Sequence, residues 1–341
     1  MENLLIANKI NKYILEKKSY ENRNIFKKIK LYFKKNYIKK YILKNCTLQL
    51  NKGESIAILG RNGAGKSTLI KILTGITIPS SGDLIVCQSK PHLRESHFLK
   101  NIGVVFGHKN SLVWDLPLID SLILHKIIYN IDEAQYYKKL NYLLDILNLS
   151  ECMESKVKFM SLGQRVKSNI LMNLLHSPAL VFLDEPTIGV DIESKNQIRE
   201  FINYEKQHNK TSFIMTSHDS TDIENCSDYI HVLSNGEIAF SEKTFETKNT
   251  YKNKTQIIVK KLNINKEIFN PILKNNDIIF KETINSYKLT IPKENERETL
   301  NFLLANNIVS FEIKAMTFED IIADMFNIAA NFNNEEEFEY E

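Results

Sequence analysis

Glycine is scarce in this chain and is confined to its middle part. The sequence has 341 residues and 11 glycines, all of them between Gly53 and Gly236. Glycine serves tight turns and close backbone approaches, so its absence after Gly236 indicates a change of domain. We predict a first domain over residues 1–245, a polar linker over 243–250, and a second domain over 252–328.

Cysteine and long apolar runs are also lacking. The four cysteines (Cys46, Cys87, Cys152 and Cys226) are far apart and form no C-x-x-C pair, which argues against a zinc site or a disulfide framework. The N-terminus has no signal-peptide core, and no uncharged apolar run approaches the ~18 residues of a membrane helix. These features favour a cytoplasmic protein without a membrane-spanning segment.

Charge is balanced overall but uneven along the chain. The net charge is +4, which is too small to favour nucleic acid as a partner. Lysines crowd the first 44 residues, and residues 329–341 form an acidic, flexible tail, so both ends are predicted to be solvated. Residues 20–40 hold several apolar side chains among lysines. They predict either a surface helix or loop, or an element that contacts anionic lipid or a membrane partner.

One glycine-rich stretch has the pattern G-x-x-x-x-G-K-[ST] of a phosphate-binding P-loop. An apolar run at Ser55–Leu59 precedes it and predicts a buried strand, and Leu69, Ile72, Leu73 and Ile76 follow at helical spacing. Backbone N–H groups at the start of such a helix bind phosphate. The predicted nucleotide-binding residues are Gly60, Arg61, Asn62, Gly63, Ala64, Gly65, Lys66, Ser67 and Thr68. Lys66 is expected on the β- and γ-phosphates and Ser67 on Mg²⁺.

Two further apolar runs end in polar residues. Ala179–Leu183 leads into Asp184-Glu185, and Thr211–Thr216 leads into Ser217-His218. Buried runs of this kind predict a parallel sheet whose carboxyl edge carries the site. At that edge Asp184 would hold Mg²⁺, and Glu185 would orient or deprotonate the attacking water.

Other segments complete the predicted fold. Residues 1–15 suggest an edge strand, 43–50, 83–87 and 102–106 suggest strands, 116–149 suggest helices, and 228–240 suggest a hairpin. Beyond residue 252 the order is strand 255–259, helix 266–273, strands 277–280 and 286–291, helix 294–304 and strand 308–313, a split β-α-β-β-α-β plan. A last helix is expected to open at Thr317 and to run to Phe326.

At this point the chain resembles the ATP-binding subunits of ABC transporters over roughly residues 1–245. Residues 160–165 (Met-Ser-Leu-Gly-Gln-Arg) resemble the family's signature motif, usually L-S-G-G-Q. Residues 184–187 (Asp-Glu-Pro-Thr) resemble the Walker B end, 188–191 the D-loop, and 217–219 the switch histidine. Residues 103–107 and 114–117 resemble a subgroup that is paired with permeases of the ABC-2 type.

The resemblance implies a fold and further site residues. The expected fold class is α/β: a P-loop NTPase head of the ABC ATPase kind, with a mostly parallel sheet core, an antiparallel β edge and a helical subdomain at about 108–165, followed by a small α+β ferredoxin-like domain. His218 would contact the γ-phosphate, and Tyr37, or its rival Tyr41, would stack on adenine. Ser161, Gly163, Gln164 and Asp191 would meet the nucleotide held by a partner subunit.

Two positions depart from the family pattern. His108 stands where the family has the glutamine that contacts the metal site, and Leu162 replaces the first signature glycine. Imidazole can ligate a metal or accept a hydrogen bond, but it is shorter than glutamine and titrates near neutrality. We therefore expect ATP binding to persist, whereas the hydrolysis rate and the coupling to a permease depend on His108. Trp114 is expected either to pack in the helical subdomain or to lie in the core.

The sequence thus predicts an ATPase that uses ATP and Mg²⁺. It would pair as a homodimer or with a paralogous subunit, at the inner face of the cell membrane, to drive a separate ABC-2-type permease, with export as the expected direction. The alternative is a non-transport or regulatory ABC-type ATPase with weak hydrolysis. Two cassettes in one chain or a long coiled-coil insert would favour a non-transport role, and the sequence has neither.

Overall fold

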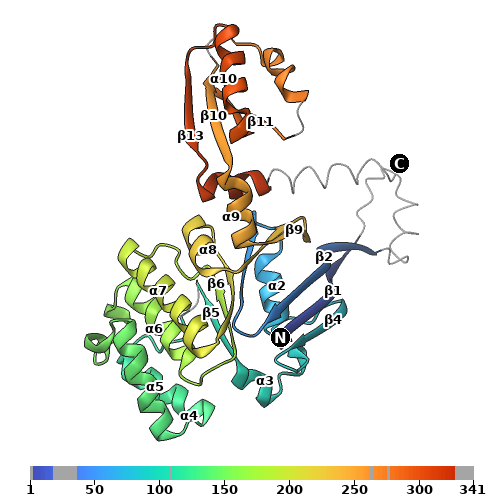
Figure 1. Ribbon diagram of the computed structural model, residues 1–341. Coiled ribbons are helices and arrows are strands. Elements are labelled where there is room, and N and C mark those ends of the chain that lie inside the picture. The colour runs from blue at the N-terminus through green and yellow to red at the C-terminus, as the bar shows by residue number, and fades with distance from the viewer. Residues whose placement is uncertain (1–2, 18–36, 108–109, 262–263, 275–276, 327–341) are drawn as a thin grey trace, which may run out of the picture. The chain divides into compact units, whose positions relative to one another are not determined.

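The computed structural model describes residues 3–17, 37–107, 110–261, 264–274 and 277–326 (Figure 1). The described chain divides into two compact units, one running to Ser241 and one spanning Glu242–Met325. Each unit has its own hydrophobic core. The expectations for residues 20–36 and 329–341 fall outside the described residues.

The first unit is built on a six-stranded sheet of order β5-β6-β7-β3-β8-β9. Neighbouring strands from β5 to β8 are parallel, so their carboxyl ends share one edge. The strands are β3 (Ser55–Gly60), β5 (Ile102–Phe106), β6 (Leu180–Asp184), β7 (Ser212–Thr216), β8 (Tyr229–Ser234) and β9 (Glu237–Lys243). The apolar runs of the sequence form the buried centre of this sheet, as predicted.

A second sheet of the first unit has the order β2-β1-β4, with antiparallel pairing. Its strands are β1 (Asn3–Lys17), β2 (Tyr37–Asn51) and β4 (Ser81–Val86). The expectation of an edge strand for residues 1–15 is wrong, because β1 is the central strand. It has a neighbouring strand on each edge, and four of its apolar side chains are buried: Leu4, Leu5, Ala7 and Ile10.

Helices cover the parallel sheet and form the helical subdomain. They are α2 (Lys66–Leu73), η1 (Pro91–Leu93), α3 (Ser96–Asn101), α4 (Leu118–Tyr129), α5 (Glu133–Ile146), η2 (Ser150–Cys152), η3 (Val157–Phe159), α6 (Leu162–Leu174), α7 (Ile192–Tyr204), the π-helical turn η4 (Glu205–Asn209) and α8 (Ser220–Cys226). The prediction of helices over 116–149 is confirmed by α4 and α5. None of the helices in the described part of the chain is long and apolar enough to cross a membrane.

The second unit has a four-stranded antiparallel sheet of order β11-β12-β10-β13. This is the strand order of a ferredoxin-like fold, so the split β-α-β-β-α-β prediction is confirmed at the level of topology. Its elements are α9 (Thr244–Lys252), β10 (Lys254–Lys260), η5 (Lys266–Phe269), η6 (Ile272–Lys274), β11 (Ile279–Glu282), β12 (Ser286–Pro292), η7 (Lys293–Asn295), α10 (Glu296–Ala305) and β13 (Phe311–Ala315), followed by a helix at 318–326.

Two local predictions in this unit are wrong. The expected helix at 266–273 is a pair of short 3-10 turns, because Pro271 lacks the N–H that a continuous helix needs. The expected linker at 243–250 lies largely in helix α9, which buries Thr244, Thr247 and Tyr251. The last helix begins as predicted, since Thr317 Oγ1 accepts a hydrogen bond from the Asp320 backbone at 3.2 Å.

Candidate functional site

The P-loop joins β3 to α2 at the carboxyl edge of the parallel sheet. Gly65 adopts φ 109° immediately before the helix, a conformation that favours glycine. Lys66 begins α2 and is 7 % exposed, and its Nζ donates to the Gly60 carbonyl at 2.7 Å. Burial lowers the pKa of the Lys66 ammonium, while the charges of Glu185 and Asp184 oppose that effect. An anion bound in the loop would relieve this cost of burial.

The two predicted carboxylates lie at the same sheet edge. Asp184 is the last residue of β6 and pairs with Thr216 of β7, whose Oγ1 donates to Asp184 Oδ1 at 2.7 Å. The chain then turns sharply, because Glu185 has φ 53°, an uncommon backbone conformation for a residue other than glycine. Its backbone N–H donates to the Thr216 carbonyl at 3.1 Å. Hydrogen bonds with β7 therefore hold both Asp184, the predicted metal ligand, and Glu185 after it.

The structure brings Glu185 and His218 together. His218 Nε2 lies 3.0 Å from Glu185 Oε1, although the two residues follow different strands. A carboxylate only accepts hydrogen bonds, so the ring presents Nε2–H to it. The glutamate side chain is 20 % exposed and the imidazole 51 % exposed, so both groups can be reached from solvent.

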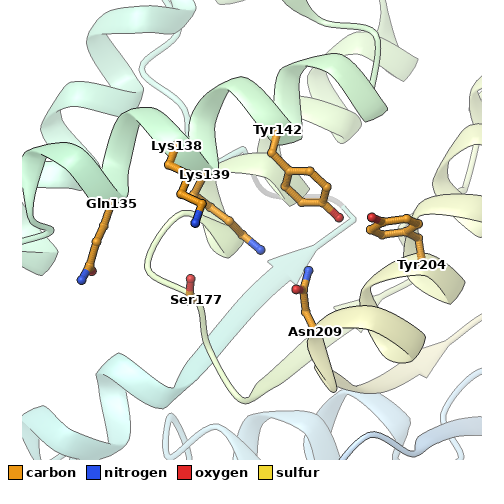
Figure 2. Close-up of a pocket in the computed structure, with 7 residues that line it drawn as sticks. All are labelled: Gln135, Lys138, Lys139, Tyr142, Ser177, Tyr204 and Asn209. Atoms are coloured by element: carbon orange, nitrogen blue, oxygen red, sulfur yellow. The ribbon is translucent and has the colours of Figure 1, made fainter.

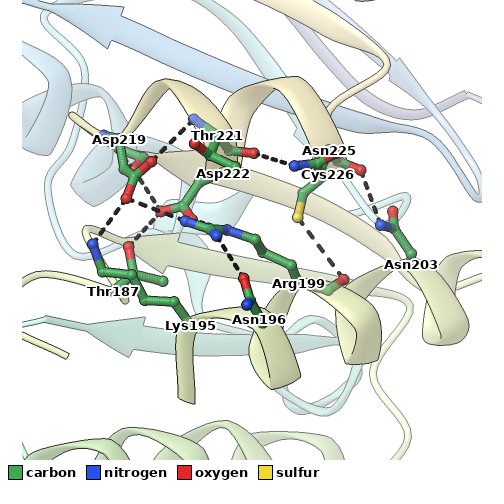
Figure 3. Close-up of polar contacts among 11 residues, drawn as sticks. Thr187, Lys195, Asn196, Arg199, Asn203, Asp219, Thr221, Asp222, Asn225 and Cys226 are labelled. Atoms are coloured by element: carbon green, nitrogen blue, oxygen red, sulfur yellow. Dashed lines mark hydrogen bonds and ion pairs between the residues drawn. The ribbon is translucent and has the colours of Figure 1, made fainter. Parts of the chain in front are cut away.

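A buried polar network holds the two loops that carry this pair (Figure 3). Asp222 of α8 accepts hydrogen bonds from Ser217 Oγ at 2.8 Å, from Arg199 Nε at 2.6 Å and from Thr187 Oγ1. Ser217 directly precedes His218, and Thr187 follows Glu185 by two residues. Asp222 is 3 % exposed and Arg199 is 9 % exposed, so the ion pair is shielded from water. Sequence reasoning missed these residues, because nothing in their spacing indicates the contact.

The predicted signature and D-loop residues gather where α6 and α7 begin. Ser161 and Gln164 form a capping box: Ser161 Oγ accepts from the Gln164 backbone at 3.1 Å, and Gln164 Oε1 accepts from the Ser161 backbone at 2.8 Å. Asp191 caps α7 through the Ser194 backbone at 2.8 Å. A Cβ on Gly163 would lie 2.4 Å from Ser194 Oγ and 2.9 Å from Asp191 Oδ2. The two helix starts therefore touch, and Leu162 does not disturb the cap.

Among the candidate adenine platforms, the surroundings of Tyr41 differ from those of Tyr37. A Cβ on Gly65 of the P-loop would lie 2.9 Å from the carbonyl of Ile42, so this part of β2 lies against the loop. Tyr41 precedes Ile42, and its ring meets that of Tyr13 edge-on at 5.5 Å. Tyr37 lies about 13 Å further along the strand at about 3.3 Å per residue. Tyr37 stays a prediction, and the geometry favours Tyr41 with Tyr13.

The predicted metal residues are only partly described. His108 lies outside the described residues. The described residue before it, Gly107, donates its N–H to the Asp184 carbonyl at 2.7 Å. Ser67 is exposed in the first turn of α2. The Ser67 hydroxyl and the Asp184 carboxylate are oxygen ligands that suit Mg²⁺. In proteins this ion is usually also bound by phosphate oxygens of the substrate. In the described part of the chain, no group of three or more His, Cys, Asp or Glu side chains could hold a metal.

A pocket of about 410 Å³ lies apart from these residues, between α5 and the end of α7 (Figure 2). Beside it the fully buried Glu205 accepts hydrogen bonds from Lys139, Tyr142 and Asn209, all of which line the pocket. None of its lining residues belongs to the predicted site. We assign this cluster to the attachment of the helical subdomain to the core.

Trp114 of that subdomain is 49 % exposed, with Arg165 over its ring at 5.1 Å, so the expectation of a core position is wrong.

A P-loop, a strand-end Asp-Glu pair, a histidine that follows the neighbouring strand and paired helix starts define a P-loop ATPase of the ABC type. Residues 43–188 match the family model described as ABC transporter. The chain is 34 % identical to the linearmycin resistance ATP-binding protein LnrL of Bacillus subtilis (strain 168), over 62 % of this chain and 68 % of that protein. It is 32 % identical to the lantibiotic transport ATP-binding protein SrtF of Streptococcus pyogenes, over 62 % and 88 % of the two chains.

The fold agrees with these relatives. A solved ATP-binding subunit of an ABC transporter superposes with a TM-score of 0.59 and 23 % identity, over 73 % of this chain and 93 % of that chain. The chain belongs to the ATP-binding subunits of ABC transporters, and it is an ATPase of that family. The resemblance recognised from the sequence is confirmed.

Proposed function

We propose that this subunit hydrolyses ATP while two copies, or one copy and a paralogue, sandwich two nucleotides between them. In each sandwich one chain supplies the P-loop, Asp184, Glu185 and His218. The other supplies the start of α6, with Ser161, Gly163 and Gln164, together with Asp191. ATP then favours the closed pair, and hydrolysis releases it.

The contact between Glu185 and His218 carries this proposal. At 3.0 Å the imidazole holds one carboxylate oxygen of Glu185 and leaves the other for the attacking water. Asp184 and Ser67 would hold Mg²⁺, whose charge would stabilise the transferring phosphate. The capped start of α6 presents backbone N–H groups and the Ser161 hydroxyl, the kind of anion site that a partner's γ-phosphate needs.

We further propose that the ATPase drives a separate ABC-2-type permease at the inner face of the membrane, in the direction of export. The names of LnrL and SrtF refer to linearmycin resistance and to lantibiotic transport, and they support a role in export. The helical subdomain also exposes four large apolar side chains on α4, suited to a membrane partner: Ile123, Leu124, Ile127 and Ile128.

Replacing Glu185 by glutamine tests the proposal. We expect Glu185→Gln to retain ATP binding and to lose turnover by at least ~100-fold, because the amide cannot accept the proton of water. The variant should double in mass when ATP is added, measured by light scattering. Glu200→Gln on the exposed side of α7 is the matched control and should behave as wild type. Equal turnover in both variants would remove Glu185 from the mechanism.

A regulatory ATPase with weak hydrolysis remains the second candidate because of His108. Restoring the family residue with His108→Gln separates the two. If His108→Gln turns over ATP at least tenfold faster than the wild type, the regulatory candidate is favoured. A change within about twofold supports the transport ATPase.

A further inference from the structure

The first two strands continue as a bare two-stranded ribbon beyond the sheet to which they belong. Pairing between β1 and β4 ends at Asn11 and Ser81. Pairing between β1 and β2 runs on, from Tyr13 opposite Tyr41 to Lys17 opposite Tyr37. We call residues 14–17 and 37–40 the distal ribbon; it lies beyond the Tyr13–Tyr41 pair. Among the described residues no third strand pairs with it.

The distal ribbon exposes large apolar side chains on both faces. Ile14 is 44 % exposed, Leu15 58 %, Tyr37 50 % and Ile38 49 %. Successive strand residues point to opposite faces, so Ile14 and Leu15 lie on different sides. A two-stranded ribbon is at best marginally stable alone in water, and clustered exposed apolar residues mark an interaction surface.

Basic side chains lie among these apolar ones. Lys40 stands opposite Ile14, and Lys39 stands opposite Leu15. The one acidic side chain, Glu16, meets Lys40 at 2.9 Å with both groups more than half exposed, an arrangement that contributes little stability. The sequence between the two strands, residues 18–36, adds seven Lys or Arg and one Glu. By sequence, residues 14–40 are therefore strongly basic and partly apolar.

We propose that the distal ribbon docks into an anionic lipid surface. Apolar side chains on both faces suit insertion into a layer that surrounds the ribbon, whereas a protein groove would cover one face. Lysines interleaved with apolar residues are the pattern of segments that lie at the interface of an anionic leaflet. This contact does not need a permease, so it goes beyond the transport function proposed above. Its failure would leave that function untouched.

Vesicle binding by the full chain tests the role of charge. We expect the wild type to bind vesicles of phosphatidylcholine with about one third phosphatidylglycerol, and to bind pure phosphatidylcholine vesicles weakly. Lys39→Glu/Lys40→Glu should bind the anionic vesicles at least about thirtyfold more weakly, from the loss of two lysines near the surface. Lys52→Glu/Lys90→Glu changes the same net charge at exposed lysines outside the ribbon and should bind within threefold of wild type.

The apolar contribution is tested at constant charge. Leu15→Ser/Ile38→Ser removes one apolar side chain from each face and should weaken binding about tenfold, with unchanged thermal unfolding and ATP turnover. Ile76→Ser/Ile78→Ser, at residues 50 % and 61 % exposed outside the ribbon, is the control and should bind as wild type. Equal binding by ribbon and control variants would overturn the proposal. Binding to membranes only when the permease is present would overturn it too, since the contact would then be with protein.

Discussion

At the scale of single residues, the choice of the adenine platform has measurable consequences. Ile42 lies against Gly65 of the P-loop, and Tyr41 next to it already holds the Tyr13 ring at 5.5 Å. We expect Tyr41→Ala to raise the KM for ATP about tenfold or more, by loss of ring stacking worth about 1–3 kcal/mol, and Tyr37→Ala to change it less than twofold. Steady-state ATP turnover measures both. The reverse order would restore Tyr37 as the platform.

Gly163 is a second such residue, because the space around it leaves no room for a side chain. A Cβ there would lie 2.4 Å from Ser194 Oγ and 2.8 Å from Ser194 Cβ, so alanine would force α6 and α7 apart. We expect Gly163→Ala to keep ATP binding, to lower turnover at least tenfold and to cost about 1–3 kcal/mol of stability. The double variant Gly163→Ala/Ser194→Gly should recover most of both losses, because it removes the two closest clashing atoms and leaves only Asp191 Oδ2 at 2.9 Å. No recovery would show that Gly163 acts through something other than this contact.

At the scale of elements, a buried histidine, His125, and a half-buried one, His176, connect α4 to the start of β5. His125 Nε2 lies 3.0 Å from His176 Nδ1, and His176 Nε2 lies 3.0 Å from the Ile102 carbonyl. A carbonyl only accepts, so His176 is protonated on Nε2, and His125 donates to its Nδ1. The Tyr129 ring stacks on both imidazoles, at 4.3 and 4.0 Å. With both rings neutral, each one donates a single hydrogen bond in this arrangement.

This histidine pair should make the fold sensitive to acid. Burial lowers the pKa of His125 to about 3 and that of His176 to about 4, against 6.5 in the unfolded chain. Between pH 6.5 and 4 the unfolded state binds more protons than the folded state. The free energy of unfolding is therefore highest above pH 6.5 and falls as the pH drops toward 4. From pH 7.5 to 5.0 each histidine accounts for about 2 kcal/mol.

Urea denaturation at the two pH values measures this loss. His125→Leu/His176→Leu should flatten the dependence, whereas His92→Leu/His97→Leu, at exposed histidines, should not. A pH dependence that is the same in both double variants would exclude the pair as its source.

The elements also show what a sequence can and cannot predict. The strands β3, β6 and β7, the P-loop and the strand-end Asp184-Glu185 follow from local pattern, because apolar runs and glycine spacing are local properties. The position of β1 in the centre of its sheet does not, since it depends on pairing with β4 across most of the first eighty residues. The contact of Asp222 with Arg199 and the approach of Ile42 to Gly65 are likewise products of folding. Pro271 did carry a local signal against the expected helix, and its missing N–H outweighed the apolar periodicity.

At the scale of the whole molecule, the two units divide the work unequally. The P-loop, Glu185, His218 and the start of α6 all lie in the unit that runs to Ser241, and the second unit has its own core, with Ile257, Leu289 and Leu303 among its buried residues. A chain that ends after residue 245 should therefore fold and turn over ATP within about twofold of the full chain. Its unfolding should remain cooperative, measured by calorimetry, because a domain with its own core folds as a unit. If the shortened chain is folded and binds ATP but hydrolyses it more than tenfold more slowly, the second unit takes part in catalysis. Adding Glu185→Gln to the shortened chain then asks whether ATP still doubles its mass; loss of that response in a folded protein would place the second unit in the dimer contact instead.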